Sequence, residues 1–312
     1  MRREGHALSG VGVVTLKELS DHFVSARMRV LEWLVVLVAL AAVYGAIQHI
    51  RDVTAEDPFL FLRLFTTAQA PLPSFTAFLG FLVPLMAIGL GFDAVNGEHS
   101  RRTLSRILSQ PIYRDALLFG KFLAGLAALS ISLVALWLLV IGLGLIMLGV
   151  PPGAEEMGRA FIFLLVTIAY AGVWLALAML FSVIFRSAAT AALVTLGFWL
   201  FITLIWPALA PAIAVALVPN GDDGTLLLTA QALARISPST LYGEAVLAIL
   251  HPATRSLGPV YISQLQGAVM GAPLPLWQSV LVAWPQIVGL IAASILLFVG
   301  GYVAFQRQEV RA

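Results

Sequence analysis

The sequence contains very long stretches without a charged side chain. No Asp, Glu, Lys or Arg occurs from Phe122 to Ala154, from Ala160 to Phe185 or from Ser187 to Gly221. A helix needs about 20 mostly apolar residues to cross a bilayer, so each stretch is long enough. Only 11% of the 312 residues are charged, against about 25% in an ordinary soluble domain. We therefore expect an all-α polytopic membrane protein, organised as one domain over residues 1–312.

Six transmembrane helices are predicted, three of them from the stretches just named. The other three are about Trp33–His49, Ser74–Phe92 and Ser279–Phe305. Within the fifth span, Pro207 and Pro211 each remove a backbone amide, which predicts a break near Trp206. A short re-entrant or interfacial helix is expected after the break. A kinked but unbroken helix is the alternative.

Lysine and arginine are distributed unevenly over the connections between these spans. Thirteen of the 18 fall in the amino-terminal segment, the second and fourth connections and the carboxyl tail. The remaining five are Arg51, Arg63, Arg159, Arg235 and Arg255. Because cytoplasmic loops carry the excess of Lys and Arg, both termini are expected on the cytoplasmic side. An even number of spans agrees with this topology.

An amphipathic helix is predicted before the first span, within residues 1–30. Its apolar stripe recurs at spacings of three and four and consists of Leu16, Leu19, Phe23, Ala26 and Val30. Thr15 and Glu18 have the spacing of a capping box, which predicts that the helix starts there. Length and polarity favour a position in the membrane interface over a span. The segment is either a general interfacial anchor or a specific docking surface.

The connection from Asp93 to Lys121 holds the densest run of polar residues in the chain. It includes a predicted short helix whose apolar stripe is formed by Leu104, Ile107 and Leu108. Three arginines lie off this stripe, and Pro111 ends the helix. A positively charged flank that touches lipid phosphates would explain the arginines alone. The apolar stripe in a cytoplasmic loop indicates a protein partner in addition.

A motif runs through this connection into the third span. It consists of Glu98, Thr103-Leu104, Leu108-Ser109, Pro111, Arg114 and Gly120-Lys121-Phe122. The motif resembles the loop between the second and third spans of the ABC-2 type permeases, the membrane subunits of ATP-binding-cassette exporters. The sequence departs from the family pattern at Arg102, where glycine is usual. The order of elements is also similar, and within the family the likeness is closest to permeases involved in copper-site maturation of nitrous oxide reductase.

The resemblance implies an ATP-driven exporter whose ATP and Mg are bound by a separate ATPase subunit. The loop would be a coupling helix that contacts this subunit through Glu98, Arg101, Arg102, Thr103, Leu104, Arg106, Ile107, Leu108 and Pro111. The amphipathic helix would be the family's elbow helix, with Leu16, Leu19 and Phe23 on its apolar face. The implied partners are a second permease copy or a related permease, membrane lipid and an outside accessory protein. The implied location is the cytoplasmic (inner) membrane.

Several other chemistries are not indicated. Gly120-Lys121 is followed by Phe122, whereas a phosphate-binding P-loop needs Ser or Thr at that position, so no ATPase site is expected on this chain. The five histidines are scattered and Cys is absent, so no metal, catalytic or cofactor-binding residue is expected. A net charge of +2 does not suggest a nucleic-acid partner. A membrane scaffold for a maturation complex is the alternative function, and a membrane enzyme is the third.

The longest loop on the outer side runs from Val218 to Gln278. The segment from Ser239 to His251 is predicted as a short helix that Ser239 caps after Pro238. Asn220 to Gly224 is predicted as a turn, since it has too few oxygen ligands for a calcium loop. The whole loop is either an interfacial lid or a gate or docking site for an outside partner.

Overall fold

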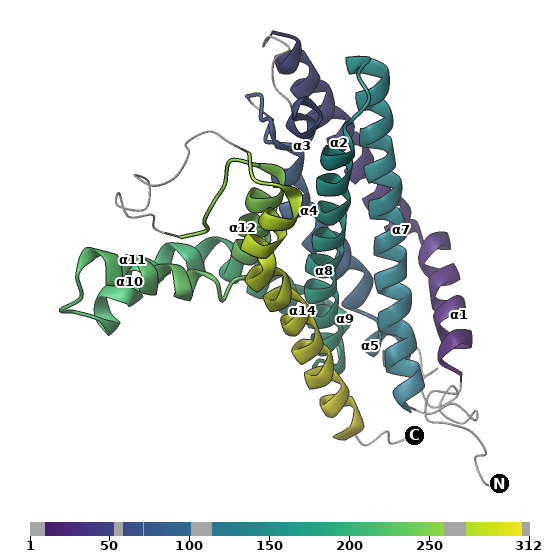
Figure 1. Cartoon of the computed structure of the whole chain (residues 1–312). Helices are drawn as coiled ribbons and strands as arrows, with labels where there is room; N and C mark the ends of the chain where they lie inside the picture. The colour runs from purple at the N-terminus through teal and green to yellow at the C-terminus, as the bar shows by residue number, and fades with distance from the viewer. Residues whose placement is uncertain (1–9, 53–58, 71, 101–113, 259–272, 308–312) are drawn as a thin grey trace.

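The computed structural model describes residues 10–52, 59–70, 72–100, 114–258 and 273–307. Within these ranges the protein is built from helices, with one isolated β-bridge between Gln69 and Leu72 (Figure 1). In chain order the elements are α1 (Val11–Val24), α2 (Ala26–Asp52), a 3-10 turn η1 (Leu60–Leu62), α3 (Arg63–Thr66), α4 (Phe75–Gly91), α5 (Asn96–Ser100), α7 (Arg114–Leu148), α8 (Ala154–Ile184), α9 (Ala188–Leu200), a π-helical segment η2 (Phe201–Ile205), α10 (Trp206–Leu217), α11 (Asp223–Ala234), α12 (Pro238–Leu250) and α14 (Leu276–Arg307).

Six helical segments in the described residues are long and apolar enough to span a membrane, which confirms the predicted fold class. They are Ala26–Gln48, Phe75–Glu98, Asp115–Leu148, Ala154–Ile184, Ala188–Leu217 and Leu276–Arg307. The helices α7, α8 and α14 contain 35, 31 and 32 residues. At 1.5 Å per residue they are about 46–53 Å long, which exceeds the roughly 30 Å of hydrocarbon. Their ends therefore extend into the interface or beyond it.

The helix α8 lies at the centre of the bundle, and α4, α7, α12 and α14 pack around it. Its large side chains Phe163, Tyr170 and Trp174 are completely buried. Figure 1 shows that α1 begins and α14 ends at the same end of the bundle, here called the terminal end. The helix α3 lies toward the opposite end, here called the far end.

Small residues allow close approach between the spans. A Cβ atom added to Gly91 of α4 would lie 2.7 Å from the Cβ of Ala178 in α8. A Cβ added to Gly120 of α7 would lie 2.8 Å from Cγ1 of Val14 in α1. Close contact at small residues is the usual way in which helices associate in membranes, because lipid supplies little hydrophobic driving force.

The fifth span does not contain the break predicted at Pro207 and Pro211. The backbone is helical from α9 through η2 to the end of α10, with Pro207 in the first turn of α10 and Pro211 inside it. Where an interruption was expected, the chain widens into a π-helix just before the first proline, and the Trp206 amide donates to the carbonyl of Phe201. A wider turn absorbs the mismatch that proline creates, so helical structure continues.

A change of direction nevertheless occurs close to the predicted position. In Figure 1, α10 leaves the bundle and forms a projecting arm with α11, which lies beside it. The indole of Trp206 closes the base of this arm by donating to the carbonyl of Leu233 at 2.7 Å. The helix α11 was not predicted. It begins at Asp223 and is capped by Asp222, whose carboxylate accepts from the Thr225 amide at 3.2 Å, so only the first part of the predicted turn is a turn.

The outside helix predicted from Ser239 to His251 is present as α12, with a different start. Ser237 occupies the cap position and Pro238 the first helical position, which suits proline because that amide has no partner in a helix. The small residues Ala245 and Ala248 of this helix are completely buried.

The amphipathic helix before the first span is real, but its start and its buried face differ from the prediction. It begins at Val11, and Thr15 lies inside it with its hydroxyl donating to the Val11 carbonyl at 2.8 Å. Leu19 and Phe23 pack against the core. Leu16, expected on the same stripe, is 69% exposed. The helix is packed along the first half of α7 (Figure 1), so close contact with Gly120 decides which side is buried.

Candidate functional site

Three charged side chains from different helices meet at the terminal end. The Lys121 ammonium group of α7 lies 2.7 Å from Oε1 of Glu98 in α5 and 2.9 Å from Oε2 of Glu18 in α1. Only 5% of the lysine side chain is exposed. A buried charge is tolerated when it is paired and hydrogen-bonded. Lys121 therefore joins the start of the loop between α5 and α7 to the amino-terminal helix.

Packing at Gly120 brings α1 close enough for this contact. Val14 lies against the glycine, and the hydroxyl of Thr15 is 3.4 Å from the Gly120 carbonyl. One helical turn later, Glu18 reaches Lys121. The sequence motif Gly120-Lys121 therefore places a close helix contact next to an internal ion pair.

A second ion pair lies next to the first. The Arg27 guanidinium of α2 is 3.0 Å from the carboxylate of Asp93, which follows α4, and lies over the ring of Phe92. Between the two ion pairs is a cavity of about 420 Å³ lined by residues of both, together with Lys17, Asp21, His22 and Gly97. We call this cavity and its two ion pairs the terminal-end cluster.

Electrostatics of the terminal-end cluster favour an ionised Glu18 and a neutral His22. Burial raises the pKa of Glu18, but the positive charges of Lys121 and Lys17 outweigh it and hold this pKa below its usual range. Burial lowers the pKa of His22, with the positive charges of Lys121 and Arg27 adding to the effect. The carboxylates of Glu18 and Asp93 act in the opposite direction and only partly compensate.

Most of the predicted coupling-helix contacts lie outside the described residues. These are Arg101, Arg102, Thr103, Leu104, Arg106, Ile107, Leu108 and Pro111. Glu98 is described, and its carboxylate points inward at Lys121 with 16% of the side chain exposed. Its contact with a second subunit stays a prediction, whereas its internal partner is a finding.

At the far end, Arg159 of α8 is completely buried. Its guanidinium donates to the carbonyls of Ile249 and Leu274, to the Ser279 hydroxyl at 3.0 Å and to Glu155 at 2.9 Å. The sequence placed this arginine among the charges of the outer face, and the structure makes it an internal clamp between α8, the end of α12 and the start of α14.

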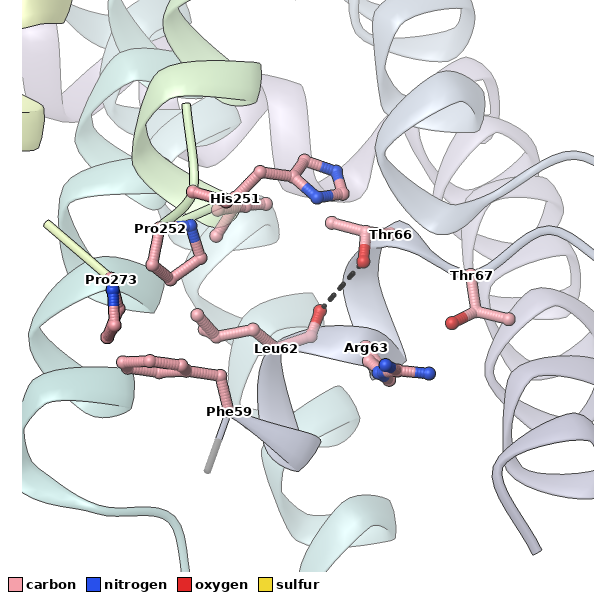
Figure 2. Close-up of a pocket in the computed structure, with 10 residues that line it drawn as sticks. Phe59, Leu62, Arg63, Thr66, Thr67, His251, Pro252 and Pro273 are labelled. Carbon is pink, nitrogen blue, oxygen red and sulfur yellow. Dashed lines mark hydrogen bonds between the residues drawn. The ribbon is translucent and has the colours of Figure 1, made fainter. Parts of the chain in front are cut away.

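Two cavities lie near this clamp. The first, of about 470 Å³, is shown in Figure 2 and is here called the outer cavity. Phe59, Pro252 and Pro273 stand on one side of it and Arg63 and Thr67 on the other. The second, of about 430 Å³, is here called the inner cavity and lies among α4, η2 and α12. Both cavities are lined by Thr66 and His251.

A chain of hydroxyl groups runs beside the inner cavity, and those of Ser239 and Thr203 line it. Tyr170 of α8 donates to the Gly80 carbonyl at 2.9 Å and lies 2.9 Å from the hydroxyl of Ser239. Ser239 in turn lies 2.8 Å from the hydroxyl of Thr203 in η2. The ring of Tyr242 stacks on Tyr170 with centroids 4.4 Å apart. Four separate helices are thus fixed around one cavity.

These sites consist of ion pairs, hydrogen-bonded hydroxyls and cavities. The described residues contain no group of three or more His, Cys, Asp or Glu side chains that can hold a metal ion. The terminal-end cluster joins α1, α5 and α7 through Lys121, and Arg27 of α2 to Asp93 after α4. Sequence reasoning missed these ion pairs and the far-end cavities. Its only signal for the first was that Glu98 and Gly120-Lys121 belong to one motif.

Comparison with known proteins gives one family and two similar relatives. The family described as "ABC-2 family transporter protein" matches residues 13–310. The probable ABC transporter permease protein NosY of Stutzerimonas stutzeri is 28% identical over 247 residues, which cover 78% of this chain and 82% of that protein. The protein of the same name from Pseudomonas aeruginosa is 32% identical over 184 residues, which cover 57% of this chain and 63% of the relative.

Proposed function

This chain belongs to the ABC-2 family of transporter proteins, and on that premise we propose that it is the permease of an ATP-driven exporter in the cytoplasmic membrane. As a permease it is a multi-pass membrane protein that works with an ATP-binding subunit. The finer part of the proposal concerns the direction of transport, the topology and the way in which ATP hydrolysis reaches the spans.

The observation that carries the proposal is the Glu98–Lys121–Glu18 contact. Glu98 is one of the last described residues before the loop that resembles a coupling helix, and Lys121 lies in the first turns of a span. A displacement of the loop would therefore be transmitted to α7 and α1 through a buried ion pair. Buried pairs resist separation because a lone buried charge is costly.

In the proposed cycle, ATP and Mg bind the partner ATPase subunits, and their closure displaces the loops of two permease copies. The copies are identical or are two related permeases, and the pathway runs between or through them. Both termini and the loop after α5 face the cytoplasm, where the ATPase is. The far-end cavities then face the outside and are the release side of the pathway.

The experiment that tests this proposal targets the apolar stripe of the loop. We expect Leu108→Asp to leave the permease inserted and folded but unable to retain its ATPase, because desolvated apolar anchors carry most of the binding energy at an interface. Arg106→Ala is expected to weaken the association mildly, and more at low salt than at high, since exposed charge pairs are screened. Ser105→Asp, one residue off the stripe, is the matched control.

The readout is copurification of the ATPase, followed by ATP hydrolysis and transport in reconstituted vesicles. If Leu108→Asp retained the ATPase at the level of Ser105→Asp and kept full ATP-driven transport, the coupling-helix assignment would be wrong. Retention of the ATPase with ATP hydrolysis but no flux of any tested solute would favour the scaffold function.

A further inference from the structure

The inner and outer cavities meet at two shared residues. Thr66 and His251 line both, so the two spaces adjoin and together extend from the middle of α4 to the far end. Each has a volume of about 450 Å³, which is within the range of small-molecule sites, about 300–1,000 Å³. The shape and chemistry of this double cavity restrict what can occupy it.

The inner cavity is uncharged and suits an apolar group. Its described lining contains no Asp, Glu, Lys or Arg; it consists of Ala77, Gly80, Phe81, Gly243, Val246 and Leu247 together with Ser, Thr and Tyr hydroxyls and His251. Those hydroxyls are held by one another and by backbone carbonyls, as in the chain from Gly80 to Thr203. An ion would lose its hydration there without compensation.

The inner cavity also opens toward the membrane. Phe81 and Leu247, at its edge, are 47% and 45% exposed. Phe81 lies within the second span, and Leu247 belongs to α12, which packs against α8 and α4. Large exposed apolar side chains at the edge of a cavity at this depth would face hydrocarbon, so a molecule can enter sideways from the bilayer.

The outer cavity has an apolar side and a polar side, and the Arg63 guanidinium belongs to the polar side. Figure 2 shows the apolar side formed by Phe59, Pro252 and Pro273 and the polar side that includes Arg63. A guanidinium offers several donors that match a carboxylate or phosphate. The hydroxyl of Thr67 is a further donor beside it, while that of Thr66 donates to the Leu62 carbonyl.

We infer that the double cavity binds an anionic single-chain amphiphile from the bilayer. Its hydrocarbon chain lies in the inner cavity beside Tyr242 and Phe81, and its carboxylate or phosphate lies in the outer cavity beside Arg63. Such molecules are the class of cargo that this site selects for release. The statement about cargo rests on the proposed export function, and the binding site itself does not.

Gly243 offers a way to fill the inner cavity without disturbing its walls. This glycine of α12 lines the cavity, and a Cβ added to it meets no atom within 4 Å. Gly300 of α14 is also helical and also has open space around an added Cβ, but it is not among the lining residues of either cavity. Gly243→Leu and Gly300→Leu are therefore a matched pair with the same change in helix propensity.

The test uses the permease in lipid nanodiscs without nucleotide. A palmitate that carries a photoreactive diazirine near the end of its chain is added, the sample is irradiated, and labelled peptides are mapped by mass spectrometry. We expect labels on residues 74–81 and 239–247. Gly243→Leu should lower this labelling about tenfold, the effect of roughly 1.4 kcal/mol of overpacking, and Gly300→Leu should leave it unchanged.

A second probe tests the head group. The corresponding diazirine hexadecanol, which has no negative charge, should label the same peptides several-fold less than the palmitate probe. A diazirine lysophosphatidate distinguishes the two anionic head groups. Labelling of these peptides equal to that by palmitate means that the site accepts phosphate, and weaker labelling means that only a carboxylate fits. Either result agrees with an anionic head group.

Two results would overturn the inference. One is labelling that spreads over the lipid-facing helices and is equal in both glycine variants. The other is equal labelling by palmitate and hexadecanol. Neither result affects retention of the ATPase, which the Leu108→Asp experiment measures separately, so failure of the binding site and failure of the exporter proposal can be told apart.

Discussion

The Lys121 ammonium group lies 2.7 Å from the Glu98 carboxylate, and both side chains are largely buried. The two residues belong to α7 and α5, on either side of the loop that resembles a coupling helix. The helices on either side of this loop are thus joined by a buried ion pair.

The first prediction is that Lys121→Met destabilises the permease by about 3 kcal/mol, because it removes the buried positive charge that pairs with the carboxylates of Glu98 and Glu18. Methionine keeps most of the length of the side chain, so the loss is chiefly electrostatic. Thermal aggregation of the purified permease in one detergent measures the change. ATP hydrolysis by the assembled complex should also lose its dependence on the permease.

Lys17→Met is the control for this prediction. Lys17 also pairs with Glu18, at 2.9 Å, but 60% of its side chain is exposed. Exposed pairs contribute about 0–1 kcal/mol. An equal loss of stability in the two variants would show that burial of Lys121 is not what makes its ion pairs important.

The second prediction concerns acid and the packing of α1. His22 faces Glu18 of its own helix, Lys121 of α7, Arg27 of α2 and Asp93. Because its folded pKa is lower than the unfolded value, the unfolded state takes up a proton first as pH falls below about 6.5. The histidine's contribution to stability is therefore complete above that pH and is lost below it, down to the folded pKa. Glu18 loses its contribution at lower pH, below its unfolded pKa of about 4.3.

Hydrogen exchange of the α1 amides, corrected for the intrinsic effect of pH, measures this change. Protection should fall below pH 6.5 by at most about tenfold per pH unit, the limit for one proton. His22→Asn should remove the dependence. His251→Asn, which changes another partly buried histidine at the far end, should leave it intact. Unchanged protection of α1 down to pH 5 in the unaltered protein would contradict the prediction.

The six spans were predictable from the sequence because they depend on a local property, the absence of charge over about 20 residues. Their ends were less so. The prediction began the fourth span at Ala160, whereas α8 begins at Ala154 and includes Arg159. A charged residue ends a predicted span unless its partners are known, and the partners of Arg159 at Ile249, Leu274 and Ser279 lie 90 or more residues away in the sequence.

The candidate site was predictable as a motif but not as a set of contacts. Glu98 and Lys121 were both recognised in the resemblance to the permease family. The pairing of Lys121 with Glu18 requires α1 to pack against Gly120. The periodicity of α1 does not predict this contact, because the stripe through Leu16 predicted a different buried face. The π-helix η2 was equally hidden, since the prolines that cause it also allow a break or a kink.

The third prediction concerns topology and uses the absence of Cys from the chain. Thr66→Cys and Ser256→Cys should react with a membrane-impermeant thiol reagent in intact cells, whereas Ser9→Cys and Ser109→Cys should react only after the membrane is opened. The positive-inside rule is the physical reason, since most Lys and Arg lie on the side of Ser9 and Ser109. Labelling of Ser109→Cys in intact cells would reverse the orientation and place the proposed coupling loop away from any cytoplasmic ATPase.

The last prediction is that Arg159 holds the far end together. Its guanidinium reaches two carbonyls, a hydroxyl and a carboxylate, and a lysine cannot satisfy all of them from one ammonium group with three donors. Arg159→Lys should therefore cost about 1–2 kcal/mol, and Arg159→Met about 3 kcal/mol, because it also leaves buried carbonyls without donors. Protection of α12 and of the first turns of α14 from hydrogen exchange should fall, while that of α1 at the terminal end stays the same. A uniform loss of protection over both ends would mean that Arg159 supports the whole bundle and not a separate outer unit. Equal stability of Arg159→Lys and Arg159→Met would contradict the expected difference between the two variants.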